Sequence, residues 1–161
     1  MNRTMIKSEN QIIDSERREF FQVAAKVAVV MPWLWSSVAS ATPDEAKTAI
    51  KKLADGKPLK RGLVKLNVPL LADHGGRVKV TISVDTPMTE ADHVKDIYLI
   101  SDGNPTPDVV NFVLGPDAGK GEVTFYMRMA KTQTTYAVAR MSDGSIQMAK
   151  GHTAVTVGGC N

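Results

Sequence analysis

The sequence predicts a mainly β protein: an immunoglobulin-like antiparallel β-sandwich of about seven strands, with one N-terminal helix and a flexible C-terminal arm. Three observations support this fold class. Before Gly56, apolar residues recur at helical spacing, whereas after it they alternate with polar residues at a period of two. The apolar runs after Gly56 are short and follow one another at roughly ten-residue spacing. Residues typical of turns separate these runs, as expected for a chain that reverses direction repeatedly.

The helix is predicted over residues 43–54. Thr42 is suited to cap its first turn, Pro43 fits the first helical position, and Glu45 stands where a capping box places its carboxylate. Gly56 is placed to end the helix. One face carries the apolar residues Ala46, Ala49, Ile50 and Leu53, so the helix should dock along one stripe.

The strands follow from alternation and from the turns between them. Val78–Val84 and Val123–Met129 alternate strictly, as a strand with one buried face does. Less regular apolar runs occupy Leu63–Val68, Ile97–Ile100, Val109–Leu114, Tyr136–Met141 and Ala154–Val157. The predicted reversals are His74–Gly76, Asp102–Pro105, Ala118–Lys120 and Asp143–Gly144. Of these, Asp143-Gly144 is the strongest hairpin signal.

Residues 1–41 have the features of a cleaved export signal rather than of the domain. Arg17-Arg18 precede an apolar run over residues 23–38, and Ala39-Ser40-Ala41 supply the small residues that signal peptidase accepts. The paired arginines resemble a twin-arginine signal, which implies delivery outside the cytoplasm. Lys26 and Pro32 interrupt the run, which argues against a stable membrane anchor. The alternative is an amphipathic helix that stays on the protein. The domain is then expected over residues 42–157, followed by the arm at 158–161.

Composition excludes several classes of protein. The chain has 161 residues, enough for one domain and a short appendage, and a net charge of +3 from 20 basic and 17 acidic residues. This balance argues against a dedicated nucleic-acid binder. A single cysteine cannot make an internal disulfide, a zinc cage or a CxxC redox pair.

We expect no metal, no cofactor and no catalytic residue in this chain. His74, His93 and His152 are far apart in sequence, and only Asn161 follows Cys160, so the ligand spacing of a blue-copper site is missing. The acidic residues in turn-like settings, Glu90, Asp92 and Asp102, are expected to be solvated or to cap turns.

Cys160 is the one residue whose setting suggests chemistry. A predicted strand ends at Val157, and Gly158 and Gly159 then separate it from the thiol. Because glycine has no side chain, such a segment can enter a narrow cleft. An exposed thiol has an ordinary pKa of about 8.5, so its reactivity would come from the enzyme that receives it. The thiol could therefore carry a group, or it could be incidental or form a lasting disulfide.

The order of several short motifs resembles the SoxY family of the bacterial thiosulfate-oxidation system. The motifs are Thr42–Ala46, Pro87–Val94, Asp102–Pro105, Lys131–Thr134, Met141–Ser145 and Val157–Cys160. The resemblance implies a periplasmic sulfur carrier with thiosulfate-derived sulfur attached to Cys160 and with Gly158 and Gly159 as its flexible arm. It implies a heterodimer with a SoxZ-like β-sandwich subunit and transient partners that are SoxXA-like, SoxB-like and SoxCD-like enzymes.

One feature departs from the family pattern, and one alternative function stays open. SoxY tails commonly end Gly-Gly-Cys-Gly-Gly, whereas Asn161 follows Cys160 here. The alternative is a non-catalytic periplasmic β-sandwich that binds or serves as a structural module, with an incidental or disulfide-linked thiol. A covalent carrier requires Cys160, and a binding module does not.

Overall fold

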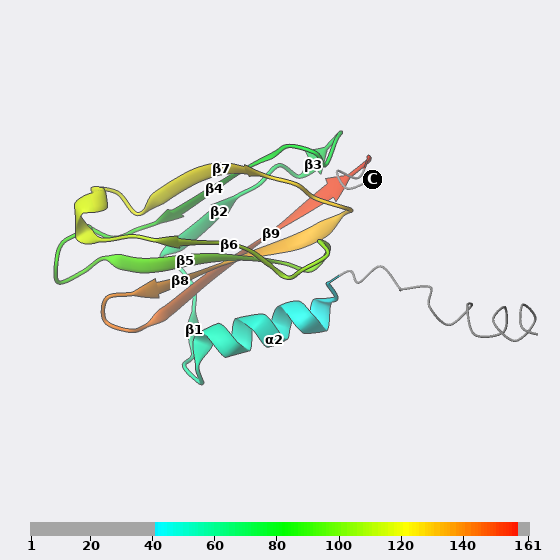
Figure 1. Cartoon of the computed structure of the whole chain (residues 1–161). Coiled ribbons are helices and arrows are strands. Elements are labelled where there is room, and N and C mark those ends of the chain that lie inside the picture. The colour runs from blue at the N-terminus through cyan, green and yellow to red at the C-terminus, as the bar shows by residue number, and fades with distance from the viewer. Residues whose placement is uncertain (1–40, 158–161) are drawn as a thin grey trace, which may run out of the picture. The chain divides into compact units, whose positions relative to one another are not determined.

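The computed structural model describes residues 41–157, which form two β-sheets and one α-helix (Figure 1). The predicted mainly β class is confirmed, and in the described residues one α-helix precedes the strands, as predicted. The elements in chain order are α2 (Pro43–Ala54), β1 (Leu59–Lys60), β2 (Val64–Asn67), β3 (Leu71–Ala72), β4 (Val78–Val84), β5 (Val94–Ser101), β6 (Asp108–Val113), the short 3₁₀ helix η2 (Pro116–Ala118), β7 (Glu122–Met127), β8 (Gln133–Met141) and β9 (Ile146–Val155).

The larger sheet has the order β1-β9-β8-β5-β6, and the smaller sheet has the order β2-β4-β7. The seven strands of four or more residues pair antiparallel, as predicted. The two-residue strands β1 and β3 differ, because both pair in parallel with β9. Leu59 lies opposite Ile146 at the start of β9, and Leu71 lies opposite Ala154 at its end. One side of β9 is thus partly covered at both ends.

Local capping sets the limits of α2. Glu45 donates its backbone N–H to Thr42 Oγ1 over 3.3 Å, and Thr42 donates its backbone N–H to Glu45 Oε2 over 2.7 Å. These two bonds form the predicted capping box. At the other end, Asp55 adopts a left-handed conformation with φ 48° and donates its N–H to the carbonyl of Lys51. Gly56, the predicted terminator, is also left-handed but comes second.

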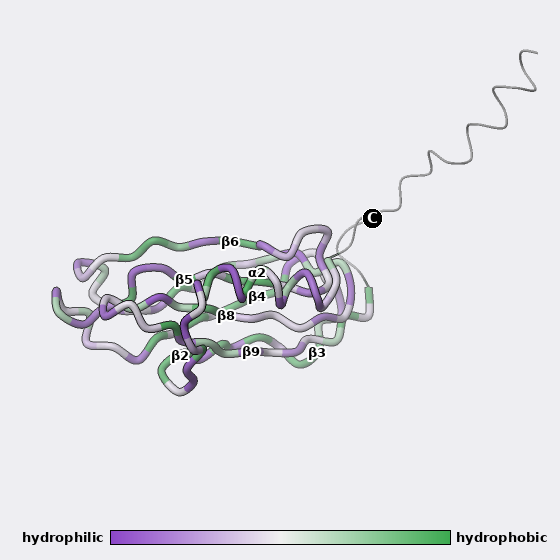
Figure 2. The backbone as a smooth tube through the Cα atoms, turned by 90° about the horizontal axis from the view of Figure 1, so that it is seen from below, coloured by the Kyte–Doolittle hydropathy of each residue, from purple (hydrophilic) through white to green (hydrophobic). Residues whose placement is uncertain are grey.

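Two apolar clusters hold the layers together. The first lies between the sheets, where the side chains of Val80 and Ile82 on β4 face Ile97 and Leu99 on β5 and are fully buried. Burying each such side chain stabilises the fold by roughly 1.5–3 kcal/mol. The second lies under the helix and contains Ala46, Ile50, Ile100, Val138 and Ile146. Figures 1 and 2 show α2 lying along the outer face of the larger sheet.

The β8–β9 hairpin turns at Asp143-Gly144, as predicted, with Gly144 at φ 78°. The predicted start of the last strand is wrong, because β9 begins at Ile146 and not at Ala154. Its middle shows no apolar alternation and includes Gly151, where an added Cβ would lie 2.5 Å from Val68 Cγ2. The strand forms there through pairing with β8 and not through its own pattern.

Candidate functional site: the root of the arm

The predicted site residues Gly158, Gly159 and Cys160 lie outside the described residues. The structure does describe the chain up to Val157, three residues before Cys160. We call Ala154–Val157 the arm root and the neighbouring Leu70–Gly75 the clamp segment. Figure 1 shows the end of β9 beside β3, which belongs to this segment.

Backbone hydrogen bonds join the arm root to the clamp segment at alternate residues. The N–H of Ala154 donates to the carbonyl of Leu70 over 2.9 Å, and the N–H of Thr156 donates to the carbonyl of Ala72 over 3.1 Å. The N–H of Gly75 donates in turn to the carbonyl of Val157 over 2.7 Å. The Thr156 hydroxyl adds a bond of 2.6 Å to the carbonyl of Asp73. The chain is therefore fixed up to Val157.

A second set of contacts holds the other side of the root. The hydroxyl oxygen of Thr132 accepts the N–H of Val155 over 2.9 Å. Gly75, which is buried, accepts the N–H of Met129 on its carbonyl over 2.8 Å. Gly75 therefore links Val157 to the loop between β7 and β8.

A partly buried polar network supports this end of the sandwich. Asn104 Oδ1 accepts the N–H of Ala130 over 3.1 Å and an amide hydrogen of Gln133 Nε2 over 3.2 Å. Asp102 Oδ1 accepts the N–H of Thr134 over 2.7 Å. Gln133 also receives a hydrogen bond from Ser101. Because Gln133 lies opposite Thr153 on β9, the network sits directly behind the arm root. Asp102 thus acts in a turn, as predicted.

Three large apolar side chains are exposed at the root and the clamp segment, beside the exposed Asp73, His74 and Thr156. Leu70 is 83% exposed, Leu71 57% and Val157 50%, although all three are large hydrophobic residues. Sequence analysis did not single out these leucines or Thr156. It placed Gly75 in the predicted reversal His74–Gly76, where the structure has a turn, but not at the arm root. The short run Leu70–Ala72 between Pro69 and Asp73 was the available signal, and it is too short to identify a strand by periodicity.

Residues 50–160 match the SoxY family, described as sulfur oxidation protein SoxY. The chain belongs to the SoxY family. The matched range takes in the arm root, both arm glycines and Cys160. The predicted resemblance is confirmed at the level of the family. No curated protein sequence is significantly similar to this SoxY-family chain.

Among solved structures, the chain is similar to the sulfur carrier protein SoxY from Chlorobium limicola f thiosulfatophilum. The two share 26% identity with a TM-score of 0.59, covering 72% of this chain and 100% of the other. The chain is also similar to the superoxide reductase (neelaredoxin) from Ignicoccus hospitalis, with 21% identity and a TM-score of 0.53, covering 71% of this chain and 94% of the other. A third similar structure is the superoxide reductase from Nanoarchaeum equitans, with 12% identity and a TM-score of 0.50, covering 59% of this chain and 99% of the other. These two similarities show a shared fold only.

The three histidines of this SoxY-family chain lie on different elements. His74 Nδ1 accepts the N–H of Gly76 over 2.9 Å, and His93 Nδ1 lies 2.9 Å from the carbonyl of Thr89. His152 is exposed on β9. Within residues 41–157, no group of three or more His, Cys, Asp or Glu side chains could hold a metal ion. No helix in this part of the chain is long and apolar enough to span a bilayer.

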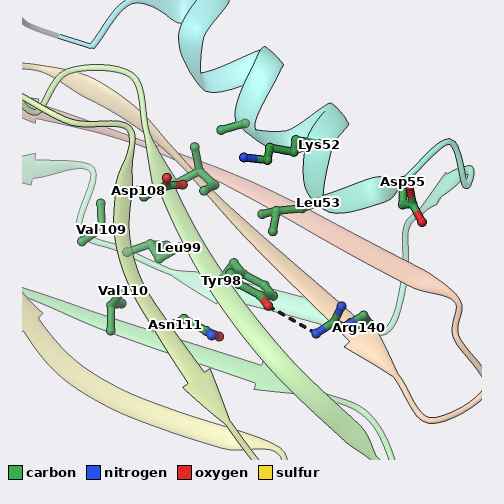
Figure 3. A pocket seen from close by; sticks show the side chains of 12 residues that line it. Lys52, Leu53, Asp55, Tyr98, Leu99, Asp108, Val109, Val110, Asn111 and Arg140 are labelled. Atoms are coloured by element: carbon green, nitrogen blue, oxygen red, sulfur yellow. Dashed lines mark hydrogen bonds between the residues drawn. The ribbon is translucent and has the colours of Figure 1, made fainter.

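A hollow lies away from the root, between α2 and strands β5 and β6. It has a volume of about 610 Å³ and is lined by charged and apolar side chains (Figure 3). Its guanidinium, Arg140, donates to Asp96 Oδ2 from Nε over 2.8 Å and to the Tyr98 hydroxyl over 3.3 Å. The hydrogen bond to Asp96 raises the pKa of Arg140. Because the Arg140 guanidinium is already paired with Asp96, it is not free to bind an anion in this hollow.

Proposed function

We propose that this chain is a covalent sulfur carrier, which holds thiosulfate-derived sulfur on Cys160 and presents it to oxidising and hydrolysing enzymes. The match to the SoxY family over residues 50–160, which includes Cys160, carries this proposal. The similarity to the sulfur carrier protein SoxY of Chlorobium limicola supports it further.

The arm root supports the carrier role through the reach that it leaves to the thiol. Three residues of extended chain span at most about 11 Å. The Cα atom of Cys160 therefore lies within about 11 Å of that of Val157, whose position the clamp segment fixes. Gly158 and Gly159 add no side chains, so the thiol can enter a narrow cleft while the domain stays outside.

The chemistry divides between the carrier and its enzymes. In the first step, a haem-containing, SoxXA-like enzyme takes two electrons from the thiol and thiosulfate. One proton is released to water, and a Cys–S–S–SO₃⁻ adduct forms. Water then attacks the terminal sulfonate sulfur in a SoxB-like hydrolase, which releases sulfate and two protons and leaves Cys–S–S⁻. A SoxCD-like enzyme then takes six electrons from the outer sulfur of Cys–S–S⁻, while three water molecules supply its oxygens and release six protons, which gives Cys–S–SO₃⁻. The chain supplies the thiol and no catalytic group.

We also propose a stable SoxZ-like β-sandwich partner and a periplasmic location reached by the twin-arginine route. The partner subunit follows from membership of the SoxY family.

Cleavage after Ala41 would turn the N–H of Thr42, which lies 2.7 Å from Glu45 Oε2, into an ammonium group that keeps its bond to this carboxylate. The N–H of Ala41 bonds the carbonyl of Asn104 over 2.7 Å, and cleavage would remove that bond. N-terminal sequencing of the exported protein should begin at Thr42; a chain that keeps residues 1–41 would contradict cleavage.

The deciding experiment is intact-protein mass spectrometry of the exported chain with its partner subunit, after incubation with thiosulfate and the conjugating enzyme. We expect a mass increase equal to one thiosulfonate group, lost on reduction and mapped to Cys160. The variant Cys160→Ser should fold normally and gain no mass. An unmodified wild-type chain would contradict the carrier role and leave a binding module. A reducible mass equal to a second protein chain would instead indicate a disulfide-linked structural subunit.

A further inference from the structure

Three exposed apolar residues lie on the arm root and on the clamp segment that is bonded to it. They are Leu70, Leu71 and Val157, which we call the root patch. Their exposed fractions are 83%, 57% and 50%. Leu71 pairs with Ala154 across β3 and β9, and the clamp bonds bring Val157 to the same segment. Exposed apolar residues that gather on neighbouring segments can mark an interaction site.

The fold does not need the leucine side chains of this patch. The clamp uses the backbone carbonyls of Leu70 and Ala72, and the side chain of Ala72 packs against the core between the sheets. The side chains of Leu70 and Leu71 belong to neither apolar cluster of the described residues. Ser in place of either leucine would keep the backbone bonds. Their hydrophobicity is therefore unexplained by the domain itself.

The length of the arm decides what covers the patch. If Cys160 reacts inside a cleft of an enzyme, at most about 11 Å separate its Cα atom from that of Val157. If the reacting atoms of an enzyme lie about 11 Å below the mouth of its cleft, the rim of the cleft must lie against the residues around Val157. The clamp segment that is bonded to the arm root contributes the exposed leucines Leu70 and Leu71 there, together with the exposed polar residues Asp73 and His74. A short arm and a fixed root therefore place the rim on the root patch.

We propose that the root patch is the docking surface for the enzymes that act on Cys160, and that it binds an apolar rim around the mouth of their clefts. This inference rests on the carrier function proposed above. Because every enzyme must reach the same thiol over the same short arm, each one covers the same patch. Binding is then mutually exclusive, and the carrier dissociates from one enzyme before the next one binds.

The test compares the double variant Leu70→Ser/Leu71→Ser with Val113→Ser as a matched control. Val113 is 77% exposed and lies at the end of β6, opposite Asp96, far along the sandwich from the arm root. Each variant, with its partner subunit, is the substrate of the conjugating enzyme at varied carrier concentration with saturating thiosulfate. The adduct on Cys160 is measured by mass spectrometry, and the same variants, once conjugated, are given to the hydrolase.

We expect the double variant to lower kcat/KM about tenfold with both enzymes, equivalent to about 1.4 kcal/mol of lost contact. The change should appear in KM and not in kcat, because the enzyme makes the same contact with the patch in the ground-state complex and in the transition state. Val113→Ser should behave as wild type. Alkylation of Cys160 by iodoacetamide should be equally fast in all three proteins, which shows that the thiol itself is unchanged.

Three results would overturn the docking proposal. The first is an unchanged kcat/KM in the double variant. The second is a double variant that no longer binds the SoxZ-like partner, which would make the patch the stable subunit interface. The third is a homodimer that the wild-type chain forms and the double variant does not, which would make the patch a contact between two copies. Failure of the carrier function gives a different result, because wild-type protein would then gain no adduct with any enzyme.

Discussion

The backbone N–H of Gly75 donates a hydrogen bond of 2.7 Å to the carbonyl oxygen of Val157. The carbonyl of Gly75 accepts the N–H of Met129 over 2.8 Å, so one buried glycine connects the arm root to the β7–β8 loop. The position of Val157 is therefore set by backbone groups on two segments that are distant in sequence. The reach of Cys160 is measured from this fixed point.

The hydroxyl of Thr132 should stabilise the arm root locally. Thr132→Val removes the acceptor of the Val155 N–H. We expect about 1 kcal/mol of lost local stability, because a typical intramolecular hydrogen bond contributes that amount. This corresponds to roughly fivefold faster amide exchange at Val155, measured by hydrogen–deuterium exchange with NMR detection. Thr132→Ser keeps the hydroxyl and should exchange at the wild-type rate. Equal exchange in Val and Ser variants would show that the hydroxyl does not hold the root.

Gly103 should tolerate no side chain. A Cβ at this position would lie 2.5 Å from Gln133 Cβ and 2.7 Å from Gln133 Oε1. Gln133 is buried and bonded to Ser101 and Asn104, so it cannot move freely. Gly103→Ala should lower the free energy of unfolding by about 2 kcal/mol, as overpacking typically does.

Gly115→Ala is the matched control for this substitution. An added Cβ at Gly115 meets no atom within 4 Å, and its φ of −125° suits any residue. Its unfolding free energy should stay within about 0.5 kcal/mol of wild type. Both variants are measured by denaturant unfolding. If Gly103→Ala were as stable as Gly115→Ala, the packing at the network would be looser than the distances indicate.

The sequence predicted those elements whose signals are local. The helix matches its predicted residues 43–54, because Thr42 and Glu45 cap it through their own side chains. Strand β4 matches Val78–Val84, because one of its faces is buried along its whole length. Strands β1 and β3 were missed, since two residues carry no period and both form only by pairing with β9.

The candidate site was predicted in part, for a related physical reason. Cys160 and its two glycines were identified from composition and spacing, and they lie outside the described residues. The clamp that fixes their origin consists of backbone groups of Leu70, Ala72 and Gly75, which have no sequence signature. Asn104 and Gln133 are polar residues near turns, where exposure is the ordinary expectation, but the half-buried Asn104 bonds the buried Gln133.

The ion pair of Asp96 and Arg140 should contribute measurably to stability. Asp96 is 8% exposed, and Arg140 donates to its Oδ2 from two nitrogens. Arg140→Met leaves a buried carboxylate without its cation. We expect the free energy of unfolding to fall by about 2 kcal/mol. This is less than is usual for breaking a fully buried ion pair, because the Arg140 side chain is 47% exposed.

Lys47→Met is the control for this ion pair, since Lys47 and Asp44 form an exposed pair across one turn of α2. Its effect on the free energy of unfolding should be much smaller, because both side chains of this pair are exposed and solvent screens their attraction. Denaturant unfolding at neutral pH distinguishes the two. Equal effects in both variants would mean that Asp96 is effectively solvated despite its position in the sheet.

Asp143 should make the β8–β9 hairpin sensitive to acid. The backbone N–H of Ser145 donates to Asp143 Oδ1 over 2.8 Å, and this bond lowers the pKa of the carboxyl from its ordinary value of 3.8. Because the folded pKa lies below the unfolded one, the ionised form stabilises the fold above pH 3.8. The contribution is lost as the pH falls through the lowered folded value.

Asp143→Asn removes the charge and keeps an acceptor oxygen, so its denaturation midpoint should lie below that of wild type at pH 7. The difference between the two proteins should shrink as the pH falls below 3.8 and then vanish. Added salt should change it little at pH 7, because the hydrogen bond from Ser145 is the main cause and the lysines Lys57 and Lys60 contribute least. A difference that persists unchanged at low pH would assign the effect to the turn conformation of Asn and not to the ionised carboxylate.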